Sequence, residues 1–202
     1  MFVAASDSIA SRQNRAWLPR FAQRGWRVLA GCLCLASVAV QAAEGKVSKE
    51  YQVKAAFLYN FTKFVEWPPA RFADKSSPIV IGLLGPNQIG DELVNIVAGR
   101  KANGRNLVVK EITSLAETGP VQVVFIGAGE DLALHELLPV LHAAGILTVG
   151  ESPQFTAAGG MITFVLEADK VRFEINRDAS EQAGLKISAQ LLKLATAVHH
   201  KS

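Results

Sequence analysis

The sequence predicts a single α/β domain: a mostly parallel sheet flanked by helices, with an antiparallel hairpin and a terminal helix at its C-terminal end. Two observations predict this fold class. Short apolar runs alternate with helical patterns along the middle of the chain, as they do where helices connect parallel strands. Near the C-terminus, an apolar run at Met161–Leu166 and an alternating run at Val171–Ile175 are separated only by residues 167–170, which suits a hairpin.

The chain begins with a leader that we expect to be cleaved. Five arginines with no acid among them precede the apolar run Val28–Val40, and small residues follow at Ala42 and Ala43. This arrangement is typical of a secretory signal peptide, and the apolar run is too short to span a bilayer. We therefore predict a signal peptide over residues 1–43, cut after Ala42 or Ala43, and one exported domain over residues 44–202.

The leader also accounts for the basic composition. It holds 5 of the 21 Lys and Arg and 1 of the 18 Asp and Glu, so the exported domain has a net charge of −1 instead of +3. We therefore expect no nucleic-acid partner. Both cysteines, Cys32 and Cys34, lie in the leader, so the exported domain has no thiol for a disulfide or a metal. Cys32 also ends a lipoprotein-like motif, but the apolar run before it is too short to favour lipidation.

Each element of the domain has its own signal. Apolar residues at helical spacing predict a helix over Val47–Trp67, which ends because two prolines follow. Continuous apolar runs are typical of strands buried on both faces. In order, we expect a strand at Pro78–Leu84, a helix at Ile89–Val97, strands at Leu107–Ile112 and Val121–Ile126, a helix at Leu132–Leu141 and a strand at Ile146–Val149. The terminal helix should begin at Asp178, because Glu181 three residues later gives a capping-box spacing, and run to Val198.

Aromatic residues on the first predicted helix are candidates for a protein-binding surface. They are Phe57, Phe61, Phe64 and Trp67. Aromatic side chains are enriched at protein interfaces, although the same spacing fits an ordinary core, which is the commoner role. A cofactor site would need polar groups converging on these rings, and we expect no cofactor.

Polar residues on the second hairpin strand are weaker candidates. Arg172 and Asn176 share a face that could meet a partner or a small ligand. The ordinary alternative is a cross-strand ion pair that uses Glu174, with Asn176 as a capping amide. We interpret a further basic cluster, around the Asn103–Gly104 turn, as a solvated loop; its members are Arg100, Lys101 and Arg105.

Two strand-to-helix turns, at Gly85 and Gly127, are candidate ligand sites in the crevice at the carboxyl ends of the strands. Neither completes a dinucleotide or P-loop motif. Glu130 and Asp131 follow the second turn and would repel a phosphate. We therefore favour ordinary turn roles for both glycines.

No residues form a catalytic or metal-binding set. His135 and His142 are seven positions apart on one predicted helix, too far to share a metal ion easily, and His199 lies at what we expect to be a frayed end. Ser152 and His142 are near one another in sequence, but Ser152 lacks the nucleophile-elbow pattern. We expect a protein that is not an enzyme and holds no metal.

Five segments match one known family in order and spacing. They are Lys54–Pro68 (KAAFLYNFTKFVEWP), Leu147–Gly150 (LTVG), Gly159–Phe164 (GGMITF), Val171–Asn176 (VRFEIN) and Gly184–Ala195 (GLKISAQLLKLA). Together they resemble the YfiR family of exported bacterial proteins over about residues 51–198.

The resemblance implies a periplasmic regulator. The best-known member of the family dimerises in the periplasm and represses an inner-membrane diguanylate cyclase through its periplasmic domain. An outer-membrane lipoprotein sequesters that member, so envelope stress raises cyclic di-GMP and biofilm formation. Its redox control uses cysteines of the mature chain, which are missing here, so we do not expect redox control in this protein.

We therefore expect a homodimeric periplasmic regulator whose partner is a membrane cyclase or sensor kinase. Two other hypotheses remain open. One is a periplasmic small-molecule sensor with its pocket near Gly85 and Gly127, and the other is a hydrolase with a dispersed site.

Overall fold

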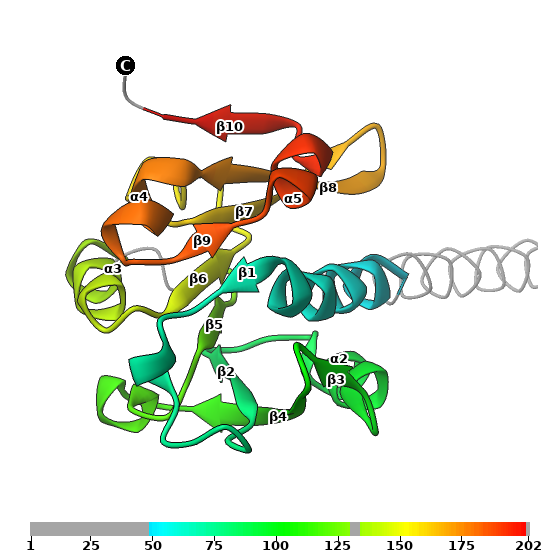
Figure 1. Cartoon of the computed structure of the whole chain (residues 1–202). Coiled ribbons are helices and arrows are strands. Elements are labelled where there is room, and N and C mark those ends of the chain that lie inside the picture. The colour runs from blue at the N-terminus through cyan, green and yellow to red at the C-terminus, as the bar shows by residue number, and fades with distance from the viewer. Residues whose placement is uncertain (1–48, 130–133, 201–202) are drawn as a thin grey trace, which may run out of the picture. The chain divides into compact units, whose positions relative to one another are not determined.

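A sheet of eight strands organises the computed structural model, which describes residues 49–129 and 134–200 (Figure 1). Its strand order is β10-β8-β7-β6-β5-β2-β4-β3. The strands are β2 (Ile79–Leu84), β3 (Lys101–Ala102), β4 (Arg105–Ile112), β5 (Val123–Ile126), β6 (Leu147–Gly150), β7 (Ile162–Glu167), β8 (Lys170–Asn176) and β10 (Ala197–His199). Neighbouring strands from β4 to β7 are parallel and the β7–β8 hairpin is antiparallel, which confirms the predicted fold class.

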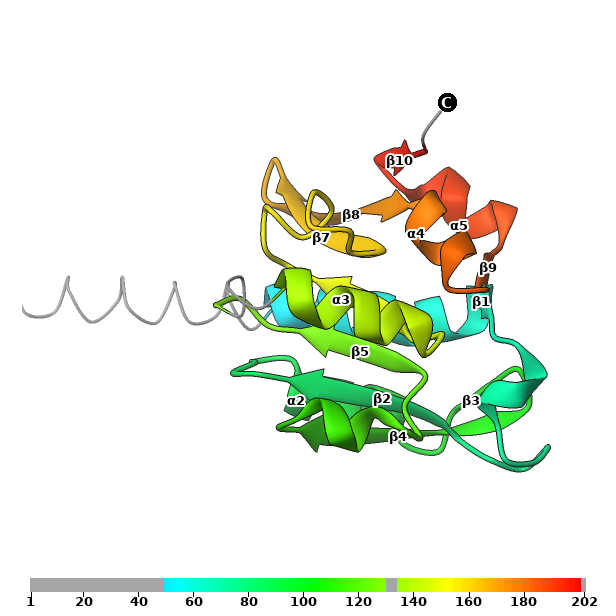
Figure 2. The same cartoon turned by 90° about the vertical axis from the view of Figure 1, so that its left-hand side faces the viewer.

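Helices cover both faces of this sheet. They are the N-terminal helix, described over residues 49–64, α2 (Gly90–Val97), α3 (Leu134–Ala143), α4 (Arg177–Gln182) and α5 (Ala189–Leu194), with 3-10 turns η1 (Pro69–Arg71) and η2 (Leu115–Thr118). Figure 2 shows α3 on one face and the N-terminal helix on the opposite face. Val123 and Phe125 of β5 belong to the core under the N-terminal helix, whereas Val124 and Ile126 belong to the core under α3. The continuous apolar run therefore forms a strand buried on both faces, as expected.

The predicted leader lies outside the described residues, so the division between residues 1–43 and 44–202 stays a prediction. All described residues belong to Gly45–Ser202, the second of two units into which the chain divides. Within the described ranges, no helix is both long enough and apolar enough to cross a membrane.

Two short strands outside the main sheet join the beginning of the domain to its end. β1 (Val65–Glu66) pairs antiparallel with β9 (Lys186–Ile187), and the Ser188 N–H donates to the Phe64 carbonyl oxygen at 2.9 Å. The first helix therefore ends at residue 64, although its apolar spacing predicts an end at Trp67. Strand pairing with a distant segment overrides the local pattern.

The expectation of one continuous terminal helix beginning at Asp178 is wrong. α4 ends early because Gly184 has a φ of 72°, a left-handed conformation that closes a helix. The chain then forms β9, α5 and β10 in succession. The cap of α4 is also two residues earlier than the expected Asp178: the Asn176 side chain accepts a hydrogen bond from the Ala179 N–H at 3.0 Å.

The hairpin has a shorter connection than expected. β7 and β8 pair as far as Glu167 and Lys170, which leaves Ala168 and Asp169 as a two-residue loop. Both loop residues have positive φ, 48° and 62°, as a type I′ turn requires. This turn matches the twist of its strands and fixes the register of the hairpin.

Candidate functional site

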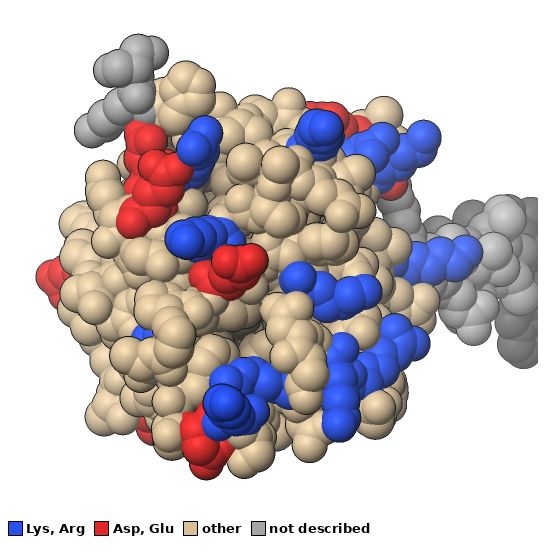
Figure 3. All heavy atoms as spheres, in the orientation of Figure 1, with Lys and Arg blue, Asp and Glu red and all other residues tan. Residues whose placement is uncertain are grey.

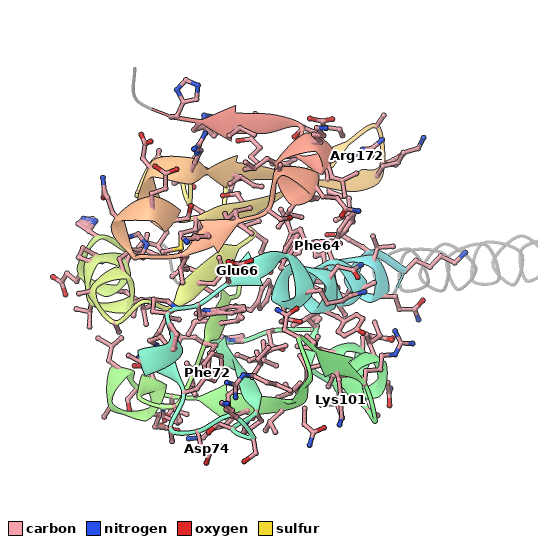
Figure 4. All side chains as sticks on the ribbon, in the orientation of Figure 1. Phe64, Glu66, Phe72, Asp74, Lys101 and Arg172 are labelled. Carbon is pink, nitrogen blue, oxygen red and sulfur yellow. The ribbon has the colours of Figure 1, made fainter. Side chains whose placement is uncertain are left out.

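An open groove lies where the N-terminal helix gives way to β1 and η1. Its volume is about 460 Å³. We call it the aromatic groove and define it by Lys63, Phe64, Trp67, Phe72, Arg105 and Ser188. Figure 3 views this side of the domain, where Lys and Arg side chains gather over the end of the N-terminal helix, β3 and the start of β4. Figure 4 shows Phe64 at the end of the helix and Phe72 on the segment beyond η1.

Trp67 is fixed in the groove by a hydrogen bond. Its indole Nε1–H donates to the backbone oxygen of Gln122 at 3.0 Å. The Gln122 side chain is buried and is itself held, because it accepts from the Val80 N–H at 2.8 Å and donates to the Arg71 oxygen at 3.0 Å. Trp67 therefore presents a rigid ring to the groove.

Arg105 is stacked on an aromatic ring at the other side of the groove. Its guanidinium carbon lies 3.7 Å from the centroid of the Phe72 ring. The same guanidinium donates to the backbone oxygens of Asp74 at 2.9 Å and Ser77 at 2.7 Å. The interpretation of this basic cluster as only a solvated loop is therefore wrong for Arg105, which is a fixed cation in the wall of the groove.

The structure separates Phe61 from the other three aromatic candidates. Phe64 and Trp67 are half-buried and line the groove. Phe57 is also half-buried but packs 5.3 Å from the Phe173 ring, outside the groove lining. Phe61 is fully buried, with its ring centroid 5.1 Å from that of Phe173, so it has the core role that we called the commoner one. An interface role stays a prediction for Phe57, Phe64 and Trp67.

The two hairpin candidates, Arg172 and Asn176, lie outside the groove, and their surroundings differ. Asn176 caps α4, as its ordinary interpretation predicts, and lines a separate hollow of about 640 Å³ beside His142. Glu174 does not pair with Arg172 but faces His199, with its carboxylate 2.9 Å from Nε2. The expected fraying of His199 is wrong, since it belongs to β10. Arg172 is exposed on β8.

The two turn glycines differ. The Gly127 N–H donates to the Leu84 oxygen at 3.2 Å, and a Cβ added at Gly127 would collide with the Pro86 carbonyl oxygen. This buried amide is therefore used by the fold, which favours the ordinary turn role of Gly127. Gly85 lines a hollow of about 530 Å³ with Glu111, and its φ of 75° serves the turn.

A buried ion pair that we did not predict from the sequence joins the N-terminal helix to the residue after β6. Lys54 Nζ donates to Glu151 Oε2 at 2.6 Å and also lies 2.6 Å from Glu50 Oε1. Burial lowers the pKa of Lys54, but hydrogen bonds with Glu151 and Glu50 outweigh it and raise the pKa above its usual value. Lys54 lies on the same helical line as the buried residues Leu58 and Phe61. A lysine on the buried line of a helix requires an acidic partner, and this signal was present in the sequence.

Comparisons with known proteins give one family and two distant structures. A family model described as YfiR/HmsC-like matches residues 51–196. No curated protein matches the chain. A conserved domain protein from Vibrio cholerae O1 biovar El Tor is 14% identical, with a TM-score of 0.46, over 59% of this chain and 54% of that one. An ABC domain from Streptococcus pneumoniae in complex with L-Trp is 12% identical, with a TM-score of 0.47, over 60% and 55%.

The matched region spans about half of each of these two structures, and neither likeness carries an argument about function. The family match supports a regulatory domain of the periplasm in general.

Proposed function

The chain belongs to the YfiR/HmsC-like family, and on this premise we propose that it binds the periplasmic domain of an inner-membrane signalling protein and represses it. The proposed target is a diguanylate cyclase or a sensor kinase. The proposal includes a homodimer as the active form and an outer-membrane lipoprotein as a competing partner. Release of the target would then raise cyclic di-GMP and favour biofilm formation.

The aromatic groove is the observation that supports this proposal most strongly. Trp67 and Phe64 are half-buried. The Trp67 indole N–H donates to the Gln122 backbone oxygen, and the Phe64 backbone oxygen accepts from the Ser188 N–H, so distant segments fix the Trp67 ring and the Phe64 backbone. Rigid aromatic side chains lose little conformational entropy on binding, and such residues dominate the energetics of many interfaces. The groove therefore has the properties of a preorganised docking site for a protein side chain.

The hydrolase hypothesis gains no support from its two candidate residues. Ser152 Oγ is bonded to Gln154 at 3.1 Å, and His142 Nε2 lies 3.5 Å from Thr148 Oγ1. Each of these two side chains therefore has a polar neighbour other than the second candidate. The small-molecule sensor keeps one favourable observation, the hollow that Gly85 lines with Glu111.

The test is capture of a membrane partner. Tagged protein produced from the full chain is incubated with detergent-solubilised envelopes, and retained proteins are identified by mass spectrometry. We expect a cyclase or sensor kinase, lost with Phe64→Asp and weakened with the milder Phe64→Ala. The matched control is Val53→Asp, because Val53 lies on the same helix and is 43% exposed outside the groove. Thermal unfolding verifies that all variants fold.

Two results would contradict the proposal. One is capture that is unchanged in both Phe64 variants, which would move the docking site elsewhere. The other is the absence of any retained membrane protein together with a co-purified small molecule, which would favour the sensor.

A further inference from the structure

We infer that the aromatic groove recognises an acidic segment of its protein partner, one that places an apolar side chain between carboxylates. This inference rests on the proposed function for its assumption that the groove is the docking site. It adds the chemistry that the partner must present.

Four cations that form no ion pair with a described residue lie at or near the groove, and we call them the basic rim. Lys63 and Arg105 line the groove, and Arg100 and Lys101 precede Asn103, which also lines it. Figure 3 shows Lys and Arg side chains gathered on this side, and Figure 4 labels Lys101. Among the described residues, every ion pair uses another cation, and the basic rim takes part in none of them. The exported domain as a whole has a net charge of −1, so this concentration of positive charge is a property of one surface and not of the composition.

Two carboxylates lie on the same side as the basic rim and offset only part of its charge. Glu66 lines the groove and lies directly opposite Lys186 in the β1–β9 pair, where unlike charges attract. The Asp74 carboxylate accepts hydrogen bonds from Ser76 and Ser77, which lower its pKa and keep it ionised. The basic rim has four cations against these two carboxylates, so this surface keeps a net positive charge.

Aromatic rings lie against three of the four cations. Arg100 lies 5.3 Å from the Tyr59 ring centroid, and Lys63 Nζ lies 5.5 Å from the same ring. Arg105 lies 3.7 Å from the Phe72 ring. Cations that are already stacked lose less freedom when a carboxylate arrives. The basic rim is therefore prepared for carboxylates in defined positions.

The shape of the site favours a protein segment over a membrane. Phe64 and Trp67 are half-buried within a groove, whereas a membrane-binding surface inserts protruding apolar side chains below the headgroups. A recessed apolar floor requires an occupant that projects into it. An apolar side chain flanked by Asp or Glu meets both the floor and the basic rim.

The test is selection from a display library of short random peptides, with protein produced from the full chain as the target. We expect enriched peptides to carry Asp or Glu on both sides of an aromatic or aliphatic residue. Their affinity should fall about tenfold between about 0.05 and about 0.5 M salt. Lys63→Glu and Lys101→Glu should each lower affinity about fivefold. Lys170→Glu on the hairpin, outside the basic rim, should leave it unchanged.

Selection of neutral or basic peptides, or of none, would overturn the inference. So would acidic peptides whose affinity is the same in both charge-reversal variants. Binding of phosphatidylglycerol vesicles without any acidic peptide would assign the basic rim to the membrane instead.

The two experiments together distinguish failure of this inference from failure of the proposed function. A membrane partner that is lost with Phe64→Asp but kept with Lys63→Glu removes this inference alone. Acidic peptides that bind while no membrane protein is captured remove only the proposed function.

Discussion

Replacing Lys54 by methionine tests the buried ion pair that fixes the N-terminal helix. Its side chain is 6% exposed and that of Glu151 is 8% exposed, with 2.6 Å between the charged atoms. Methionine keeps the apolar stem but leaves the Glu151 carboxylate buried without its cation. Removing one partner of a buried pair costs about 3–5 kcal/mol.

We expect the lower end of this range for Lys54→Met. Glu151 keeps a hydrogen bond from the Ala128 N–H at 3.1 Å, and Glu50, at 23% exposure, can turn to solvent. A loss of about 3 kcal/mol lowers Tm by about 6–12 °C in a domain of this size. The control is the double variant with Glu151→Gln, which removes the stranded charge and keeps an acceptor, and it should recover more than half of the loss.

The pH dependence gives an independent measurement. Because the pKa of Lys54 is raised above 10.5, the native state holds its proton more tightly than the unfolded state does. The contribution is therefore complete below pH 10.5 and is lost as pH rises through the native pKa. Thermal unfolding followed by circular dichroism should show this alkaline loss in the parent protein and not in Lys54→Met. A Lys54→Met loss below about 1 kcal/mol, or a double variant no more stable than the single one, would refute the reasoning.

Three further predictions concern single residues. Gly127→Ala should destabilise the domain by about 2 kcal/mol or more in urea unfolding, because the added Cβ meets the Pro86 carbonyl. Gly119→Ala is the control and should change the stability little, because the space around Gly119 is open. Equal effects of the two substitutions would contradict the packing argument. Asn176→Ala should cost about 1 kcal/mol through loss of the α4 cap, and Asn176→Asp should restore most of it; no loss in the alanine variant would argue against capping. Hydrogen bonds from Ser76 and Ser77 lower the pKa of Asp74, so its carboxylate stabilises the native state above pH 3.8. The Tm difference between the parent protein and Asp74→Asn should therefore vanish as pH falls through the native pKa of Asp74. A Tm difference that persists in strong acid would be inconsistent with this cause.

Local sequence patterns predicted the strands of the sheet because a strand that is buried on both faces needs only a short run of apolar residues. The strand Val123–Ile126 has no polar position, and a strand with both faces covered needs none. The C-terminal region shows the opposite case. Leu185 and Leu192 share one helical line and Leu191 and Leu194 the neighbouring one, which fits one helix. Gly184 nevertheless ends α4, and Leu194 on α5 is exposed. Helical periodicity cannot distinguish one helix from a strand and a second helix that fall on the same spacing.

The site was predictable only in part. The sequence identified Phe64 and Trp67, yet it gave Phe61 the same standing because all three share one wide apolar face. Burial of Phe61 depends on Phe164 and Phe173 of the hairpin, about a hundred residues away. A single-sequence pattern holds no information about such pairs.

Two further groove residues come from segments that are distant from Phe64 and Trp67 in the sequence. Arg105 and Ser188 reach it through β4 and through the β1–β9 pairing. Lys54 is the exception, since its position on the buried line of the helix was itself a readable signal.

The pairing of β1 with β9 also sets the order in which the groove forms. About 120 residues separate Val65 from Ile187, so this contact closes one of the longest loops in the domain and gains nothing until the chain is nearly complete. A chain synthesised from its N-terminus has Phe64 and Trp67 early but lacks Ser188 until the end. The proposed docking surface is therefore among the last parts to form, and we expect that a truncated or half-folded copy does not compete for the proposed partner.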